Sequence, residues 1–125
     1  MMQIENTGID GVVIDIKPLD HLTGTNAFIR AGQWDYERVT YDYRIDSDEK
    51  NITYYVRVQG YAIEGDVDSK DAVIKLLTPL LGKHYYPHGV EYGEEENFPK
   101  EIVERAKTLL SKLAQDIAPY NKESK

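Results

Sequence analysis

The chain has no cysteine among its 125 residues. This absence excludes a disulfide framework, thiolate-bound zinc, an iron–sulfur cluster and a cysteine nucleophile. Long apolar runs are also missing, since no stretch approaches the roughly 20 residues of a membrane span. Residues 1–11 have neither the basic nor the apolar region of a signal peptide. We therefore expect a cytoplasmic protein that makes no membrane contact.

Clusters of positive charge are missing too. The chain carries 22 Asp and Glu against 15 Lys and Arg, a net charge of −7, and its basic residues are scattered. Binding to a phosphate backbone depends on neutralising phosphates with Lys and Arg, so this balance opposes it. We expect no nucleic-acid partner.

The sequence contains no glycine-rich phosphate loop and no nucleophile elbow. His84 and His88 would lie roughly 13 Å apart on an extended segment, which is too far to share one metal ion. The motif Asp46-Ser47-Asp48 begins like a calcium loop, but Lys50 takes a ligand position. We expect no catalytic residue, no metal site and no cofactor, and a non-enzymatic protein more readily than an enzyme.

The length and the 41% share of hydrophobic residues are typical of one globular domain with a sizeable core. We expect a single domain over residues 1–125. Its compact part should span about residues 8–118, with both ends frayed.

Residues 32–65 hold the only Trp, six of the ten Tyr and two runs in which apolar and polar residues alternate. Alternation with a period of two predicts strands, and the polar residues 47–51 predict the turn of a hairpin. The apolar positions are Val39, Tyr41, Tyr43 and Ile45, then Ile52, Tyr54, Val56 and Val58. The intervening positions are Arg38, Thr40, Asp42, Arg44 and Asp46, then Thr53, Tyr55, Arg57, Gln59 and Tyr61.

The segment before the hairpin predicts a strand and a short helix. The β-branched run at residues 12–16 is typical of a strand. A helix of about two turns should follow, because Pro18 suits a first helical position and Gly24 suits a stop. After it, residues 28–29 form either a returning strand or part of a helix that continues to Ala31.

Beyond the hairpin, residues 72–77 predict a further strand and residues 80–86 resume an extended pattern. The two segments form either two strands joined at Thr78-Pro79 or one bent edge strand. Residues 87–93 should end this extended region.

The C-terminal segment predicts a long amphipathic helix with one apolar stripe. Asn97 suits the N-cap, Pro99 the first turn and Pro119 the stop, and residues 121–125 should form a frayed tail. The stripe consists of Ile102, Ala106, Leu109, Leu110, Leu113 and Ile117.

This order of elements predicts an α+β domain, an antiparallel sheet of about five strands with a short and a long helix on one face. A sheet that is covered on one face must hydrate the other face or give it to a partner. The uncovered face is therefore the main functional feature that the sequence predicts.

Aromatic and arginine side chains should gather on that face. Tyr, Trp and Arg are favoured at the centres of protein interfaces. Cross-strand aromatic pairs that only support a twisted sheet explain the same pattern equally well. The candidate binding surface consists of Trp34, Tyr36, Arg38, Tyr55, Arg57 and Tyr61.

Several segments resemble the YugN-like family of small bacterial proteins over about residues 8–118. They are Ile9-Asp10-Gly11, Ala31-Gly32-Gln33-Trp34-Asp35-Tyr36, Tyr41-Asp42-Tyr43-Arg44-Ile45-Asp46, Gly65-Asp66-Val67-Asp68, and Leu77-Thr78-Pro79-Leu80-Leu81 with His84 and Tyr86. The resemblance implies a fold similar to the TATA-binding-protein-like class, in strand-helix-four-strand-helix order. It implies no activity, because the family is uncharacterised. The chain departs from the family pattern at Leu80, where an aromatic residue is common, and at residues 91–96.

Taken together, these features favour an interaction module, with self-association through the open sheet face as the first candidate and another protein as an alternative partner. The competing hypothesis is a small-ligand-binding protein or small enzyme. Its pocket would lie between the sheet and the C-terminal helix near Trp34, Tyr36 and His84, with Tyr86 close by.

Overall fold

The structure is a computed structural model that describes residues 1–32, 35–85, 89–91 and 98–123. Its strands are β1 (Met2–Gln3), β2 (Val13–Asp15), β3 (Ile29–Arg30), β4 (Arg38–Asp46), β5 (Ile52–Glu64), β6 (Val73–Leu76), β7 (Leu80–Tyr85) and β8 (Gly89–Glu91). Its helices are α1 (Ile16–Thr25), α2 (Lys100–Ile117) and a 3₁₀ turn, η1 (Ala118–Tyr120).

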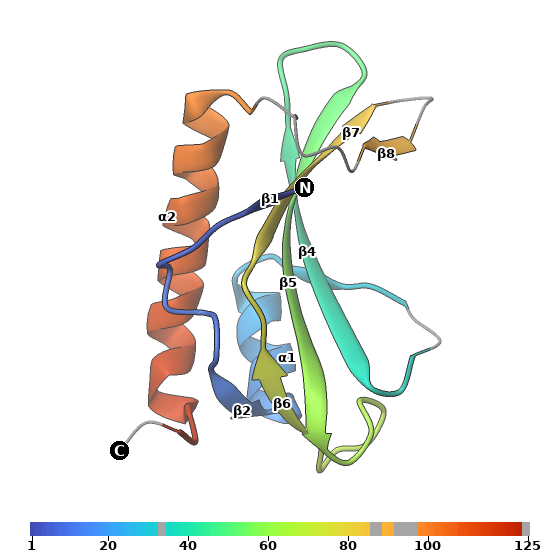
Figure 1. The fold of residues 1–125 in the computed structure, drawn as a ribbon, viewed down its shortest axis with the longest axis vertical. Coiled ribbons are helices and arrows are strands. Elements are labelled where there is room, and N and C mark those ends of the chain that lie inside the picture. Colours follow the sequence, from blue (N-terminus) through green and yellow to red (C-terminus); the bar gives the residue numbers. More distant parts are fainter. Residues whose placement is uncertain (33–34, 86–88, 92–97, 124–125) are drawn as a thin grey trace.

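All the strands belong to one antiparallel sheet with β5 at its centre (Figure 1). Strand β4 pairs with one side of β5, and β3 lies outside β4. Strands β6 and β7 follow one another along the other side of β5. Outside them lie β2, β1 and β8. The fold is therefore α+β, as the sequence predicts.

The hairpin of β4 and β5 confirms the predicted alternation. Tyr41 lies opposite Val58 and Ile45 opposite Tyr54, so the apolar positions of both strands share one face. The turn closes at Asn51, whose φ of 66° is a left-handed conformation that Asn tolerates better than most residues.

Helix α1 begins at Ile16 and ends at Thr25, one turn longer than the sequence predicts. Pro18 lies inside the first turn, where its missing N–H costs no hydrogen bond. The helix continues through Gly24, and its C-cap is Asn26, whose N–H donates to the carbonyl of Leu22 at 3.2 Å. The alternative of a helix that continues to Ala31 is wrong, because β3 is the returning strand.

Helix α2 confirms the predicted stripe. Ile102, Ala106, Leu110, Leu113 and Ile117 are buried and Leu109 is partly buried. The N-cap is Pro99, which precedes the first turn that we expected it to occupy. The expected cap at Asn97 lies outside the described residues. Pro119 falls in η1, so the helix stops where the sequence predicts.

Strands β6 and β7 are two strands joined at Thr78-Pro79, one of the two predicted alternatives. The other alternative, an edge strand, is wrong, because β2 covers β6 and both β1 and β8 cover β7. We predicted neither β1 nor β8, since strands of two or three residues show no periodicity.

The described parts of both ends, which we expected to be frayed, are hydrogen-bonded. At the start, β1 pairs with β7, and Ile4 is buried. At the end, the Asn121 carboxamide oxygen accepts a bond from the Val13 N–H at 3.1 Å. The Lys122 N–H donates to the Val13 carbonyl at 2.7 Å. The last described residues therefore lie against β2.

Both helices lie on one face of the sheet, and the hydrophobic core fills the layer between them and the strands (Figure 1). No helix in the described part of the chain covers the other face, which we call the open face. The largest fully buried side chains are Tyr41, Tyr54, Ile4, Ile9, Ile14, Leu19, Ile45, Ile74, Leu76, Leu81, Leu110 and Leu113.

Gly60 lies on the core face of β5, where β6 packs closely against it. A Cβ atom there would overlap the side chain of Ile74 and lie 3.0 Å from the Lys75 carbonyl oxygen. We expect Gly60→Ala to lower the free energy of unfolding by about 1–3 kcal/mol, because this site leaves no room for a methyl group.

The matched control is Gly24→Ala in α1, where a Cβ would meet no atom within 4 Å. The same substitution should raise stability there by about 0.5–1 kcal/mol, because alanine favours the helix. Urea denaturation of both variants measures the two effects. Equal effects of the two substitutions would contradict this account of Gly60.

Candidate functional site

Strand register places a set of polar and aromatic side chains on the open face. Residues directly opposite one another in a ladder share a face, so the pairings define cross-strand rows. The rows are Arg38–Tyr61–Lys75–Val13, Thr40–Gln59, Ile29–Asp42–Arg57–Leu80–Gln3, Arg44–Tyr55–Gly82, Asp46–Thr53–His84 and Glu64–Val73–Asp15.

The structure brings together four of the six residues in the candidate binding surface. Arg38 lies opposite Tyr61, while Tyr55 and Arg57 follow on the same face of β5. Tyr36 is 60% exposed but lies in the connection before β4, which begins at Arg38. Trp34 lies outside the described residues.

Asp42 and Arg57 form an ion pair near the centre of the open face. The Arg57 guanidinium donates from Nε to Asp42 Oδ1 at 2.8 Å and from Nη2 to Oδ2 at 3.0 Å. Both side chains are about three-quarters buried. Two parallel bonds of this kind fix the guanidinium, so Arg57 is a rigid part of the face.

A hollow of about 250 Å³ opens beside this ion pair, lined by Met1, Asp42, Tyr55, Arg57, Gly82 and His84. The rings of Tyr55 and His84 meet edge to face, with centroids 6.2 Å apart. Gly82 provides the space, since a Cβ there would lie 3.1 Å from the end of the Met1 side chain.

His84 thus lies on the face that points away from the helices. The pocket that we expected near His84, between the sheet and α2, is wrong in its position. That layer is filled by buried side chains such as Tyr54, Leu81 and Leu110. Side chains alternate between the two faces along β7, and His84 lies opposite Thr53, whose side chain is on the open face. Tyr86, expected close by, lies outside the described residues.

The open face differs in charge from the chain as a whole. Its rows contain Arg38, Arg44, Arg57 and Lys75 against Asp15, Asp42, Asp46 and Glu64, so the positive and negative side chains balance, whereas the chain carries a net charge of −7. The excess of acidic residues therefore lies elsewhere on the molecule.

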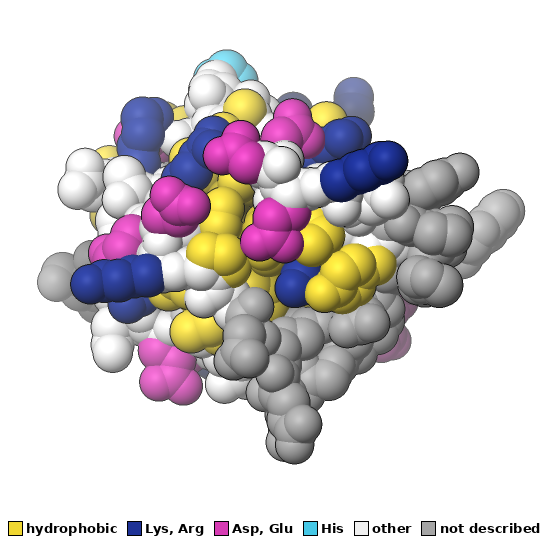
Figure 2. Space-filling view, turned by 90° about the horizontal axis from the view of Figure 1, so that it is seen from above, with side chains coloured by type: hydrophobic (Ala, Val, Ile, Leu, Met, Phe, Trp, Pro, Cys, Tyr) yellow, Lys and Arg dark blue, Asp and Glu magenta, His cyan; other side chains and the backbone are white. Residues whose placement is uncertain are grey.

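The end of the molecule seen from above shows a different pattern (Figure 2). Hydrophobic side chains emerge in the middle of this view, with Asp and Glu next to Lys and Arg around them. The two signs of charge are mixed among the described residues here, so the view shows no large basic patch.

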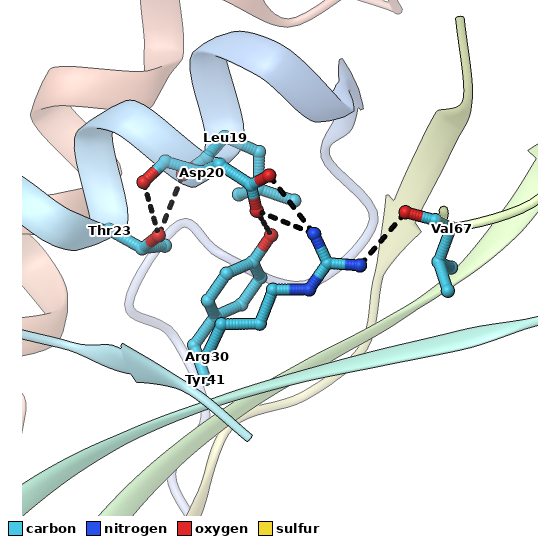
Figure 3. A network of polar contacts seen from close by, with 6 residues as sticks. All are labelled: Leu19, Asp20, Thr23, Arg30, Tyr41 and Val67. Atoms are coloured by element: carbon cyan, nitrogen blue, oxygen red, sulfur yellow. Dashed lines mark hydrogen bonds and ion pairs between the residues drawn. The ribbon is translucent and has the colours of Figure 1, made fainter. Parts of the chain in front are cut away.

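On the helix side, a polar network joins α1, β3 and β4 (Figure 3). The Tyr41 hydroxyl donates to Asp20 Oδ1 at 2.5 Å. Arg30 Nη1 donates to Asp20 Oδ2 at 3.0 Å, and Arg30 Nη2 donates to the Val67 carbonyl at 2.8 Å. Burial, and then the hydrogen bond to Asp20, raise the pKa of Tyr41 far above its usual value. Tyr41 is therefore a neutral donor at any ordinary pH.

A hollow of about 460 Å³ adjoins this network. The sequence did not reveal it, because its walls come from segments far apart in the chain. Two of these segments, represented in the wall by Ala31, Gly32 and Asp35 and by Val67 and Asp68, also carry the family resemblance. The lining residues are Ile16, Lys17, Asp20, Arg30, Ala31, Gly32, Asp35, Arg38, Val39, Val67, Asp68, Ser69 and Lys70.

The described residues include no group of three His, Asp or Glu side chains arranged to hold a metal ion. No described helix is both long and apolar enough to cross a membrane.

The model of the YugN-like family matches residues 4–123 of the chain. The chain belongs to the YugN-like family. The uncharacterized protein YlbA of Bacillus subtilis (strain 168) is 53% identical over 114 residues, 91% of this chain and 93% of YlbA. The uncharacterized protein YugN of the same organism is 22% identical over 85 residues, 68% of this chain and 62% of YugN.

A solved structure has the same fold as this YugN-like chain. The crystal structure of the uncharacterized conserved protein YugN from Geobacillus kaustophilus HTA426 is 46% identical to it. The TM-score is 0.82, and the match covers 95% of this chain and 97% of that one. These matches confirm the resemblance seen in the sequence.

The raised pKa of Tyr41 predicts how stability depends on pH. An exposed tyrosine in the unfolded chain ionises near pH 10, while folded Tyr41 keeps its proton to higher pH. The contribution of Tyr41 to the free energy of unfolding is therefore fully present below about pH 10. Above it, stability falls by up to about 1.4 kcal/mol per pH unit.

The Tyr41→Phe variant has no hydroxyl at this position, so it lacks the pH-dependent contribution of Tyr41 to stability. We expect the variant to be less stable than the parent at pH 8, by about 0.5–3 kcal/mol for the lost hydrogen bond. Urea denaturation from pH 8 to 11 should show the two stability curves parallel below pH 9 and converging above pH 10. Curves that stay parallel to pH 11 would contradict the raised pKa.

Proposed function

We propose that this protein is a non-enzymatic interaction module that associates with a second copy of itself through the open face. The single observation that carries the proposal is the chemistry of that face. It combines two tyrosines with arginines that register places beside them, Arg38 opposite Tyr61 and Arg44 opposite Tyr55. Tyr and Arg dominate the energetics of many protein interfaces.

Charge supports the open face over other surfaces. Two copies that each carry −7 repel one another at long range. Since the open-face rows hold four cationic side chains and four carboxylates, contact through this face brings together the parts of the two molecules that lack the acidic excess.

The rows also favour one relative orientation. Consider a two-fold axis that runs across the strands at the Asp42–Arg57–Leu80 row. It places the Arg38 row of one copy over the Asp46 row of the second copy, so opposite charges meet there. On the axis itself, the Asp42–Arg57 ion pair of one copy lies over the same ion pair of the second copy, where the two charges of each pair already compensate one another. An axis along the strands would instead bring Arg38 near Lys75 of the second copy. We therefore propose the axis across the strands, which gives an isologous interface.

The open face is large enough for a protein interface of the smaller kind. Strand β5 has 13 residues, which corresponds to roughly 43 Å at about 3.3 Å per residue. The central strands stand three abreast, since β6 and β7 follow one another along one side of β5, and at about 4.8 Å spacing they give a width of roughly 14 Å. The footprint is at most roughly 600 Å² per copy, or roughly 1,200 Å² for the pair, which lies at the lower end of the range for standard interfaces.

We expect the parent protein to form a dimer in sedimentation equilibrium. Arg38→Asp and Asp46→Arg should each weaken it roughly fivefold, which is about 1 kcal/mol, because each places like charges opposite one another. The double variant should recover most of the affinity. Asp46→Arg also removes the ion pair between Asp46 and Arg44. Both of these side chains are highly exposed, so this loss should have little effect on the stability of each copy.

Tyr55→Ala should have a larger effect, more than tenfold, because it removes an aromatic side chain near the centre of the face. The matched control is Arg105→Asp, which makes the same charge reversal on the exposed side of α2 and should leave the dimer unchanged. Far-UV circular dichroism verifies that each variant is folded. A parent that stays monomeric at 100 µM, or a double variant weaker than both single variants, would overturn the proposal.

Arg57 is a poor probe of the interface. A carboxylate at that position would face Asp42 directly, because the two residues are register partners. Arg57→Glu would therefore disturb the sheet itself as well as the association.

A further inference from the structure

The hollow beside the Asp20–Arg30–Tyr41 network has the size and shape of a small-molecule site. Its volume of about 460 Å³ lies within the range that such sites occupy. Its walls come from α1, the β3–β4 connection, the start of β4 and the turn after β5. Ile16, Val39 and Val67 supply buried apolar surface among these walls.

One side of the hollow is held rigid by the network in Figure 3. Arg30 is fixed from two directions, by the Asp20 carboxylate and by the Val67 carbonyl. Tyr41 fixes Asp20 in turn. A site whose polar groups are already fixed binds with little ordering cost. Because Asp20 and Arg30 compensate one another, the charge that a ligand meets comes from the other lining residues.

Those other charges have both signs. Lys17 and Lys70 supply two cations, Asp35 and Asp68 supply two carboxylates, and Arg38 borders the hollow with its side chain on the open face. Asp35 also accepts a bond from the Glu37 N–H at 2.8 Å. Within the described part of the chain, no ion pair joins these five side chains to one another. The two lysines and the two aspartates are exposed, so they are available to a ligand.

A ligand of one charge sign fits this lining poorly. A simple anion would approach the carboxylates of Asp35 and Asp68, and a simple cation would approach the ammonium groups of Lys17 and Lys70. A molecule that carries both a negative and a positive group can pair with each set, through charge-assisted hydrogen bonds. The Ser69 side-chain oxygen accepts from the Asp71 N–H at 3.1 Å and keeps its own hydroxyl proton as a further donor.

We infer that this hollow binds a small zwitterion with a carboxylate and an ammonium group, of which a free amino acid is the simplest example. The carboxylate would be held by Lys17 and Lys70, and the ammonium group by Asp68 and Asp35. Arg38 borders the hollow, but register places its side chain on the open face, so the site does not depend on self-association.

The test is a thermal-shift screen of the twenty common L-amino acids, each at 10 mM, followed by calorimetric titration of those that bind. We expect at least one amino acid to raise the melting temperature, because a ligand of the native state stabilises it by mass action. Its two half-molecules, the acid without the amino group and the amine without the carboxylate, should each bind at least tenfold more weakly.

Two exposed residues of the turn after β5 are suitable for substitutions that test the site. Lys70→Ala and Asp68→Asn should each lower the affinity for the amino acid at least fivefold, while the melting temperature of the unliganded protein stays unchanged. The matched control is Lys107→Ala on the exposed side of α2, which should bind like the parent.

Three outcomes would overturn the inference: no shift with any amino acid, a half-molecule that binds as well as the amino acid, or binding unaffected by both turn variants. Tyr55→Ala separates the two proposals, because it should weaken the dimer and leave amino-acid binding intact. A monomeric parent that still binds an amino acid would overturn the proposed function alone.

Discussion

The register between β4 and β5 is the constraint on which the rest of the structure depends. It runs without a break from Arg38 opposite Tyr61 to Asp46 opposite Thr53. Because side chains alternate between faces, a slip of one residue would send Tyr41 and Ile45 to solvent and Asp42 into the core. Helices α1 and α2 have an apolar surface to cover only in the native register. The same pairing places Asp42 against Arg57.

Much of the fold follows from periodicity along the chain. The two alternating runs predict the central hairpin and its faces, and the stripe of α2 predicts the helix that covers the core. Short-range patterns fail where tertiary contacts decide. Gly24 is a reasonable stop from sequence, yet α1 continues one residue further. Strand β1 exists because β7 offers it a pairing edge, which no pattern within residues 1–11 records.

The candidate sites were predictable to different degrees. Period-two alternation is enough to place Arg38, Tyr55, Arg57 and Tyr61 on one face, and it would also have placed His84 there if the register of β7 had been known. The Asp20–Arg30–Tyr41 network could not be predicted, because its members lie on three separate elements and only the folded chain brings them together. The large hollow has the same origin.

The outermost strands have a consequence for how this molecule meets others. Strands β1, β2, β3 and β8 are each only two or three residues long. A sheet edge recruits another chain by offering a row of unpaired backbone groups, and such short edges offer few of them. Growth into fibrils from these four short strands is therefore disfavoured, although the sheet is wide and rich in tyrosine. What the sheet presents to its surroundings is mainly a broad surface of side chains.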